Sequence, residues 1–325
     1  MIGKISENDF MDLVIDQIPK VENRMRKSVN DHNPELKNAI DHLLSSGGKR
    51  IRPTVTLLTG GMLGADQEIC IILAAAIEML HTATLVHDDL IDGALLRRGI
   101  STLNARWSPA ATVLTGDYLF ARAAKLAAET GSIEVMQLFA DTLATIVNGE
   151  INQMFPGDGL TDLQKYEKRI YAKTASMFEL ATTAAATLSP VSQNTKVKMG
   201  QFGFDIGMAF QIIDDVLDLT GKQATVGKPV ASDLRLGIIT LPVIYYIDMH
   251  PDDKELQHIL SGNHYEEHVM DSLVHSLNQS GAIERAVEEA KNYVDNSITI
   301  LSKMPENPEK ESLIELASYI IDRKL

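Results

Sequence analysis

Apolar residues recur every three or four positions along almost the whole chain, and this spacing limits the fold more than any other feature. The run from Ile69 to Leu90 is the clearest case, since it is apolar over most of its length. Alternating runs rich in Val, Ile, Thr and aromatic residues, which would indicate strands, are scarce. The apolar residues also lie on too many faces for exposed rods. The sequence therefore predicts an all-α protein.

Glycine and proline residues stand where the predicted helices need ends, as at Gly47-Gly48, Gly131 and Pro251. We expect helices at about residues 8–30, 34–45, 53–63, 67–93, 109–129, 132–154, 162–186, 194–219, 239–249, 253–261, 265–278, 281–303 and 308–323. No Ser/Gly-rich or Pro-rich linker divides the chain, so we expect a single helical domain over residues 1–325. The more polar segment after Pro251 is expected at its periphery.

Charge restricts the ligands that the chain can bind. Its 44 Asp and Glu residues against 30 Lys and Arg give a formal net charge of -14. A surface this acidic repels nucleic acid and anionic lipid, so we expect no nucleic-acid partner. An anionic ligand must instead meet a local basic cluster or a metal ion.

The single cysteine, Cys70, excludes a disulfide within the chain and a zinc site made of cysteines alone. The first residues lack the apolar region of a secretory signal, and no run reaches about 18 uninterrupted apolar residues. We therefore expect a cytoplasmic protein without an integral membrane segment.

Two acidic triplets end two of the most apolar predicted helices. They are Asp88, Asp89 and Asp92 in the first and Asp214, Asp215 and Asp218 in the second. Positions i and i+4 share a helix face, so each triplet can point two or three carboxylates into one space. The like charges repel, and acids at a helix C-terminus oppose the helix dipole, each by about a few tenths of a kcal/mol. A cation relieves both effects, and oxygen ligands without cysteine suit Mg²⁺, which takes its remaining ligands from water and substrate phosphates.

A basic loop supplies the opposite charge. Lys49, Arg50 and Arg52 follow Gly47-Gly48, and Pro53 is placed to open the next helix. Such a loop can hold a diphosphate without a metal ion. Near the first triplet, His81 lies two helical turns before Asp88, and Arg97 and Arg98 follow the triplet closely.

Each of these features also has a simpler interpretation. The triplets can be solvated helix ends, the loop from Lys49 to Arg52 a solvated charge run, and His81 a core or surface histidine. Gln211 and Thr174 can satisfy core hydrogen bonds, and Lys228 can be a solvated loop lysine. Two acidic triplets and a basic loop in one chain favour a diphosphate site over these separate interpretations.

Taken in order, the motifs resemble the trans-polyprenyl diphosphate synthase family. Those that carry the resemblance are Gly47-Gly48-Lys49-Arg50-Ile51-Arg52-Pro53, His81 to Asp92 with Arg97-Arg98-Gly99, Lys173-Thr174, Phe210-Gln211 to Asp218, Gly227-Lys228-Pro229 and Asp233 to Pro242. They span about residues 40–245. The resemblance implies a single all-α bundle around a deep central cavity, usually dimeric, and is closest to the medium- and long-chain synthases of quinone side chains.

The resemblance also implies a role for each motif. The aspartates would bind Mg²⁺ ions, commonly three, through Asp88, Asp89, Asp92, Asp214, Asp215 and Asp218. The diphosphate of isopentenyl diphosphate would be held by Lys49, Arg50, Arg52, His81 and Arg98. The allylic diphosphate would contact Arg97, Lys173 and Lys228. The carbonyl and hydroxyl groups at Lys173-Thr174 and the amide of Gln211 would face the allylic cation. The expected catalytic set is Asp88, Asp89, Asp92, Lys173, Thr174, Gln211 and Asp214.

The implied reaction joins isopentenyl diphosphate to an allylic diphosphate without a protein nucleophile. Product length is expected to depend on the residues about one turn before Asp88. Ala83 and Thr84 are small and would leave the cavity open for an all-trans product of C30 or longer, with a geranylgeranyl (C20) diphosphate synthase as the alternative. Many relatives have a lysine where this chain has Ile238, so one diphosphate contact that the resemblance implies lacks its lysine here.

Three other function classes fit parts of the sequence. A metal phosphohydrolase could use His81, His87 and Asp88, but it would leave the second triplet and the basic loop unused. A terpene cyclase would share the metal set but has no use for a second diphosphate pocket. A non-catalytic prenyl-binding subunit of a heteromeric synthase would not need both triplets, and Ile238 is the one feature in its favour. We therefore expect a homodimeric enzyme, and the need for a small accessory subunit stays open.

Overall fold

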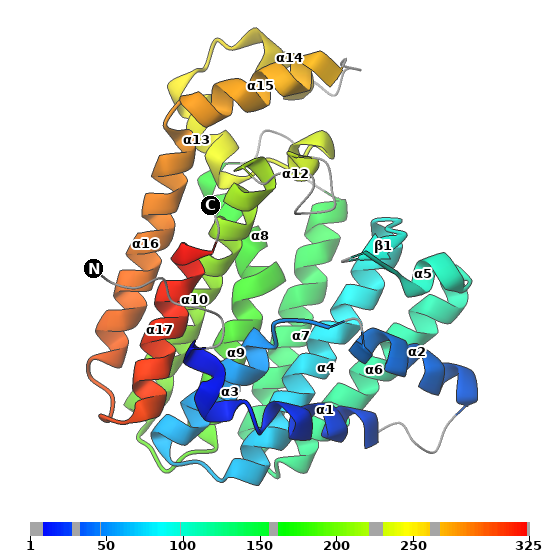
Figure 1. Ribbon diagram of the computed structural model, residues 1–325, viewed down its shortest axis with the longest axis vertical. Coiled ribbons are helices and arrows are strands. Elements are labelled where there is room, and N and C mark those ends of the chain that lie inside the picture. The colour runs from blue at the N-terminus through cyan, green and yellow to red at the C-terminus, as the bar shows by residue number, and fades with distance from the viewer. Residues whose placement is uncertain are drawn as a thin grey trace.

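The computed structural model describes residues 9–27, 33–45, 47–97, 99–155, 162–220, 230–260 and 267–323, and it is almost entirely helical (Figure 1). The helices are η1 (Asp9–Val14), α1 (Ile18–Lys27), α2 (Pro34–Ser45), α3 (Ile51–Leu63), α4 (Gln67–Ile91), α5 (Leu103–Arg106), α6 (Pro109–Glu129), α7 (Ile133–Met154), α8 (Leu163–Ile170), η2 (Tyr171–Ala175), α9 (Ser176–Thr187), α10 (Gln193–Thr220), α12 (Ser232–Arg235), α13 (Leu241–Met249), α14 (Lys254–Leu260), α15 (Glu267–Gln279), α16 (Ala282–Leu301) and α17 (Pro308–Asp322). Strands β1 (Leu96–Arg97) and β2 (Ile100–Ser101) pair antiparallel. The predicted all-α class is confirmed.

The longest predicted helices match the structure best. The segments predicted at 67–93, 109–129 and 132–154 are α4, α6 and α7. The segment predicted at 8–30 is divided by a turn between η1 and α1. The short elements α5, α12 and the β1–β2 hairpin were not predicted, because four residues or fewer are too few to show a period.

Helix α4 forms the centre of the bundle and packs most extensively against α6, with further contacts to α1, α3 and α9 (Figure 1). Among the described residues it is the one helix long and apolar enough to cross a membrane, and 78% of that apolar window is buried inside the bundle. Its apolar character is therefore accounted for by core packing on all sides. Figure 1 shows α14 and α15 together at one end, away from the main bundle, as expected for the segment after Pro251. The same expectation was wrong for α16 and α17, which pack against α10 and α3 because their apolar faces complete the core.

A row of glycines lets α10 approach the preceding helices closely. A Cβ atom at Gly203 would lie 2.5 Å from the Phe178 carbonyl oxygen and 2.2 Å from Thr182 Oγ1. One turn later, a Cβ atom at Gly207 would lie 2.5 Å from Ala175 Cα. Because the next position on this face is Gln211, the glycines bring the functional end of α10 against η2 and α9.

We expect Gly203→Ala to destabilise the fold by about 1–3 kcal/mol or more, since the added methyl group overpacks a backbone contact that cannot move aside. The matched control is Gly61→Ala in α3, where the Cβ atom would meet Glu309 Cγ at 3.1 Å, a flexible side chain. That control should leave stability unchanged or raise it through higher helix propensity. Thermal unfolding of both variants checks the prediction, and equal losses would contradict it.

Candidate functional site

The first triplet ends α4, and its three carboxylates have different environments. Asp88 and Asp92 make no side-chain hydrogen bond to any described residue, whereas Asp89 is 6% exposed and accepts a hydrogen bond from Arg97 Nε at 2.8 Å. Burial raises the pKa of Asp88 to about 6, Lys173 opposes this rise, and Glu150 and Asp92 add to it. Asp88 therefore lies among charges of both signs contributed by η2 and α7.

Arg97 uses only its Nε atom in the ion pair with Asp89. Its side chain is 39% exposed, so the two terminal nitrogens of the guanidinium remain available to a ligand at the end of α4. Arg97 lies on β1, the first strand of the β1–β2 hairpin that follows α4.

The second triplet ends α10 and is also divided. Asp214 Oδ1 pairs with Arg323 Nη2 at 2.7 Å. Burial raises the pKa of Asp214, while Arg323, Arg52 and Lys49 oppose the rise. This carboxylate therefore faces basic side chains from α3, the loop before it and the end of α17.

Asp215 and Asp218 point into protein contacts instead. Tyr166 donates to Asp215 Oδ2 and Gln211 Nε2 donates to Asp215 Oδ1, both at 2.8 Å. Burial raises the pKa of Asp215 to about 7 despite the hydrogen bond from Gln211. Asp218 accepts hydrogen bonds from the backbone amides of Ser232 at 3.2 Å and Asp233 at 3.1 Å, so it caps the start of α12.

A chain of hydrogen bonds connects the second triplet to η2, whose Lys173 acts on the first triplet by its charge. Thr174 Oγ1 donates to Gln211 Oε1 at 2.6 Å, and Gln211 donates on to Asp215. Lys173, beside Thr174, is the charge that most opposes the rise in the pKa of Asp88. Both residues lie in the π-helical turn η2, where the amide of Ser176 bonds to the carbonyl of Tyr171, five residues back. Such π-turns are frequent at functional sites, because the extra residue re-aims the side chains of the helix.

The basic loop and the start of α3 face the second triplet. Arg52 Nη1 lies 3.4 Å from His81 Nε2, and its guanidinium lies over the Phe178 ring, 4.9 Å from the centroid. Lys49 Nζ donates to the Tyr319 hydroxyl at 2.8 Å. Since both cations act on the pKa of Asp214, they belong to the same site as the second triplet.

Arg50 requires a correction. Its Nε and Nη1 atoms donate to Glu22 at 2.9 Å and Glu78 at 2.8 Å, and Nη2 donates to the Leu44 carbonyl at 3.1 Å. Burial alone would lower the pKa of Arg50, but the carboxylates of Glu78 and Glu22 outweigh it and raise the pKa. All three nitrogens thus have protein partners, so Arg50 is not placed to bind a diphosphate with the other two cations of the loop.

Two residues of the last helix were missed by the sequence analysis. Tyr319 and Arg323 lie one turn apart near the end of α17 and reach Lys49 and Asp214, respectively. Arg323 also lies over the Phe210 ring at 4.3 Å, and its Nη1 atom is buried without a partner among the described residues. The spacing of four residues was the available signal, but nothing in the sequence indicated where the last helix packs.

Two predicted ligands, Arg98 and Lys228, lie outside the described residues. Ala83 has no exposed surface, and Thr84 is 7% exposed, with its hydroxyl donating to the His81 carbonyl at 2.8 Å. Ala83 thus packs against its neighbours, and a substrate tail could pass it only after they shift. The control of product length by these two positions stays a prediction.

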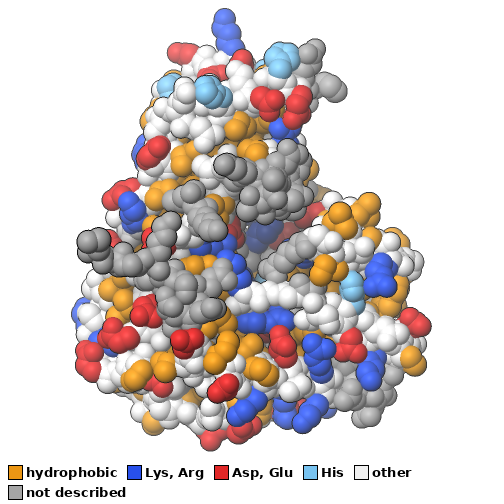
Figure 2. All heavy atoms as spheres, in the orientation of Figure 1, with side chains coloured by type: hydrophobic (Ala, Val, Ile, Leu, Met, Phe, Trp, Pro, Cys, Tyr) orange, Lys and Arg blue, Asp and Glu red, His pale blue; other side chains and the backbone are white. Residues whose placement is uncertain are grey.

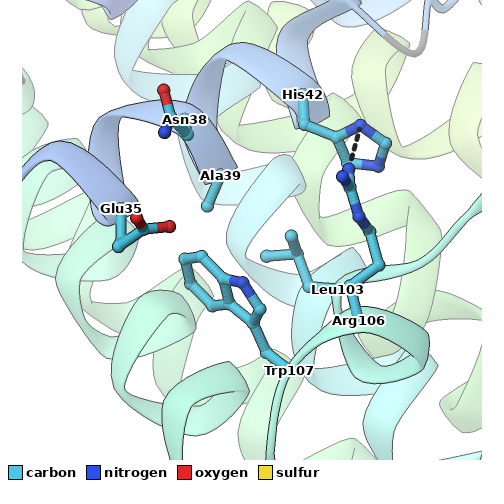
Figure 3. Close-up of a pocket in the computed structure, with 7 residues that line it drawn as sticks. All are labelled: Glu35, Asn38, Ala39, His42, Leu103, Arg106 and Trp107. Atoms are coloured by element: carbon cyan, nitrogen blue, oxygen red, sulfur yellow. Dashed lines mark hydrogen bonds between the residues drawn. The ribbon is translucent and has the colours of Figure 1, made fainter.

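A pocket of about 250 Å³ lies between α2 and α5, apart from the aspartates. Figure 3 shows Trp107 and Arg106 pointing toward Glu35, Asn38 and His42 of α2, and Arg106 Nη1 lies 3.2 Å from His42 Nδ1. None of the predicted site residues lines this pocket.

The chemistry of the donor set fits a divalent metal ion. The carboxylates of Asp88 and Asp214 are partly buried and that of Asp92 is exposed, and protein donors do not fully use the oxygen atoms of any of the three. Within the described ranges, no three His, Cys, Asp or Glu side chains converge closely enough to hold an ion alone. Such a set matches Mg²⁺, which takes few protein ligands and completes its shell with water and phosphate. In Figure 2, basic and acidic side chains gather together in a recess near the middle of the visible face.

The chain is similar to known proteins over most of its length. The family model for polyprenyl synthetase matches residues 33–277. Heptaprenyl diphosphate synthase component 2 of Geobacillus stearothermophilus is 36% identical over 308 residues, covering 94% of this chain and 95% of the relative. Solanesyl-diphosphate synthase 2 of Oryza sativa subsp. japonica is 33% identical over 330 residues, covering 98% of this chain and 80% of the relative.

A solved structure is similar over its whole length as well. The polyprenyl synthase of Caulobacter crescentus CB15, complexed with calcium and isoprenyl diphosphate, superposes with a TM-score of 0.93 at 31% identity, covering 100% of both chains. Together with the two acidic triplets and the basic loop, these similarities show that the chain belongs to the polyprenyl synthetase family.

Proposed function

We propose that this chain condenses isopentenyl diphosphate with an allylic diphosphate to make an all-trans polyprenyl diphosphate. The observation that carries the proposal is the presence of two separate cation groups, one beside each acidic triplet. The charges of Lys173 and Arg97 lower the pKa of Asp88 against the effect of burial. Those of Lys49, Arg52 and Arg323 do the same for Asp214. Two anionic substrates can therefore bind at once with their reacting ends between the triplets.

The allylic diphosphate is assigned to the first group. The terminal nitrogens of Arg97 have no hydrogen-bond partner among the described residues, and Lys173 lies close enough to lower the pKa of Asp88, so both can bind phosphate oxygens there. Asp88, Asp92 and Asp214 would hold the Mg²⁺ ions, commonly three in the family. The prediction included Asp89, Asp215 and Asp218 as well, but we leave these three out because protein groups donate hydrogen bonds to their carboxylates. When bound, these ions neutralise the charge that develops on the leaving diphosphate. Asp89, Asp215 and Asp218 orient Arg97, Gln211 and α12, respectively, through the hydrogen bonds that they accept.

The proposed reaction breaks the carbon–oxygen bond of the allylic diphosphate and forms one carbon–carbon bond. The isopentenyl double bond supplies the electron pair, pyrophosphate leaves, and a proton is lost from the isopentenyl unit. The Thr174 hydroxyl donates to Gln211, so its oxygen lone pairs remain available to face positive charge. The side chains of this chain thus bind and orient the substrates, and none acts as a covalent nucleophile.

We propose a product of C30 or longer, of the quinone side-chain type. The names of the heptaprenyl and solanesyl synthases to which the chain is similar support this length. The small side chains at Ala83 and Thr84 agree with it, provided that the side chains packed around Ala83 shift as the tail grows. Thr84 lies one turn before Asp88 on the same face of α4, so a tail growing from the metal site passes it first.

We propose a homodimer in the cytoplasm. Six large apolar side chains of α6 and α7 are between 39% and 79% exposed, and they are Val113, Leu114, Ile133, Val147, Ile151 and Met154. Apolar side chains grouped on two consecutive helices support a protein interface. The name "component 2" of one relative raises a small accessory subunit as the other candidate for this surface.

Removal of divalent metal should abolish turnover, because the ions stabilise the leaving group. Asp88→Ala and Asp214→Ala should each lower kcat by about two to three orders of magnitude or more. The matched control, Asp295→Ala on the exposed side of α16, should keep full activity. Incorporation of labelled isopentenyl diphosphate with and without EDTA measures the effect, and activity that survives EDTA would rule out the metal assignment.

Arg52→Gln should raise the KM for isopentenyl diphosphate by about tenfold or more and change the KM for the allylic substrate little. The reason is that Arg52 belongs to the cation group beside Asp214, not to the one beside Asp88. Arg26→Gln, a half-exposed arginine of α1, is the control and should change neither constant. An equal rise for both substrates would argue against two separate diphosphate sites.

Thr84→Phe should shorten the product toward C15 to C20, because an aromatic ring one turn before Asp88 blocks the path of the tail. Consumption of the allylic primer should stay within about twofold, since the metal site is untouched. Thr84→Ser keeps the small volume and should keep the product length. Chromatographic sizing of the products under excess isopentenyl diphosphate measures the product length. A wild-type product of C20 or shorter would refute an open path for the tail past Thr84.

A further inference from the structure

The buried side chain of Arg50 connects four helices at the entrance to α3. It is 10% exposed and contacts Glu22 of α1, the Leu44 carbonyl of α2 and Glu78 of α4. Its Nη2 atom lies 2.8 Å from Glu22 Oε1 in addition to the Nε contact. A buried guanidinium with this many partners has one favoured geometry, because any other rotamer would leave a charge unpaired.

The backbone of Arg50 has an unusual conformation. Its φ of 47° and ψ of 33° lie in the left-handed region, which among the described non-glycine residues only Ala231 shares. The carbonyl of the same residue accepts hydrogen bonds from the Thr54 amide at 3.0 Å and the Thr54 hydroxyl at 2.9 Å, so this conformation starts α3. Side chains disfavour left-handed backbone, which persists only where the surroundings hold it.

Contacts to α4 fix the loop in register. Arg50 pairs with Glu78, and two residues later Arg52 lies beside His81, three residues further along α4. Glu78 is 5% exposed, so water has little access to its carboxylate and cannot easily take the place of Arg50 as its partner. The pair at Arg50 and Glu78 therefore sets the position of the turn from which both Lys49 and Arg52 project.

We propose that Glu78 and Arg50 form a positioning pair that holds the left-handed turn before α3, so that Lys49 and Arg52 are pre-oriented for one diphosphate. The inference rests on the proposed function, since that diphosphate is the one of isopentenyl diphosphate. Neither Glu78 nor Arg50 touches the substrate in this arrangement. Their effect reaches the substrate only through the two cations on either side of Arg50.

The test is Glu78→Gln, which keeps the shape and removes the charge. Wild-type enzyme must first make polyprenyl diphosphate, and its failure to do so would refute the proposed function rather than the pair. In the variant, the KM for isopentenyl diphosphate should rise by about tenfold, with the KM for the allylic primer and kcat within about twofold. Arg50→Lys, which keeps the charge but loses the planar fork, should give a similar rise. Combining the two should add little, because both break the same contact.

Two further variants keep the test decisive. Glu22→Gln affects the more exposed partner, at 30% exposure, and should raise the same KM by about twofold to threefold even if Glu78→Gln does not fold. Asp205→Asn neutralises a carboxylate that is 3% exposed outside the site and should leave both KM values unchanged. The proposal is overturned if Glu78→Gln and Glu22→Gln lower only the melting temperature or raise both KM values equally. It is also overturned if only Arg50 variants raise the KM, since Arg50 would then be a direct ligand.

Discussion

Carboxylates that end two core helices and are partly withdrawn from water are the constraint on which the rest of this structure depends. Burial raises the pKa values of Asp88 to about 6 and Asp215 to about 7, and it also raises the pKa of Asp214. The protein compensates with cations from several elements around the site, including Lys173 of η2 and Arg323 after α17. The remaining negative charge is what a divalent cation and its phosphate ligands would balance.

Close helix packing brings these charges together. Glycines on the inner face of α10 let its backbone approach α9 and η2, so that Gln211 meets Thr174 at 2.6 Å. On the other side, a Cβ atom at Gly116 of α6 would lie 2.1 Å from His87 Nε2, so α6 packs directly against the end of α4. Small residues at these crossings therefore position the site as much as the charged residues that form it.

The sequence predicts the long helices and the acidic triplets well, because both depend on local spacing. Helix α4 needs only its apolar period, and Asp88 and Asp92 need only the four-residue repeat. The π-helical turn at Lys173 was not predictable, since a change in backbone hydrogen bonding leaves the apolar spacing almost unaltered. The role of Arg50 was equally hidden, because Glu22 and Glu78 are distant in sequence and charge type does not distinguish a ligand from a buried partner. Arg323 was missed for the same reason.

Neutral hydrogen-bonding groups surround Asp215, and in the proposed function they allow one site to bind anions and to form a cation. Thr174 and Gln211 connect Asp215 to η2, and the Tyr166 hydroxyl connects it to α8. In the proposed reaction the allylic cation forms beside this link, where a free carboxylate would capture it as an ester. Asp215 is not free to attack the cation, because both of its oxygens accept hydrogen bonds and it is 4% exposed. In the proposed reaction, oriented neutral dipoles would stabilise the cation without bonding to it, and the more exposed carboxylates would stay at the diphosphate end. The separation of charged and neutral acceptors therefore follows from the chemistry that the site has to permit and the side reaction that it has to prevent.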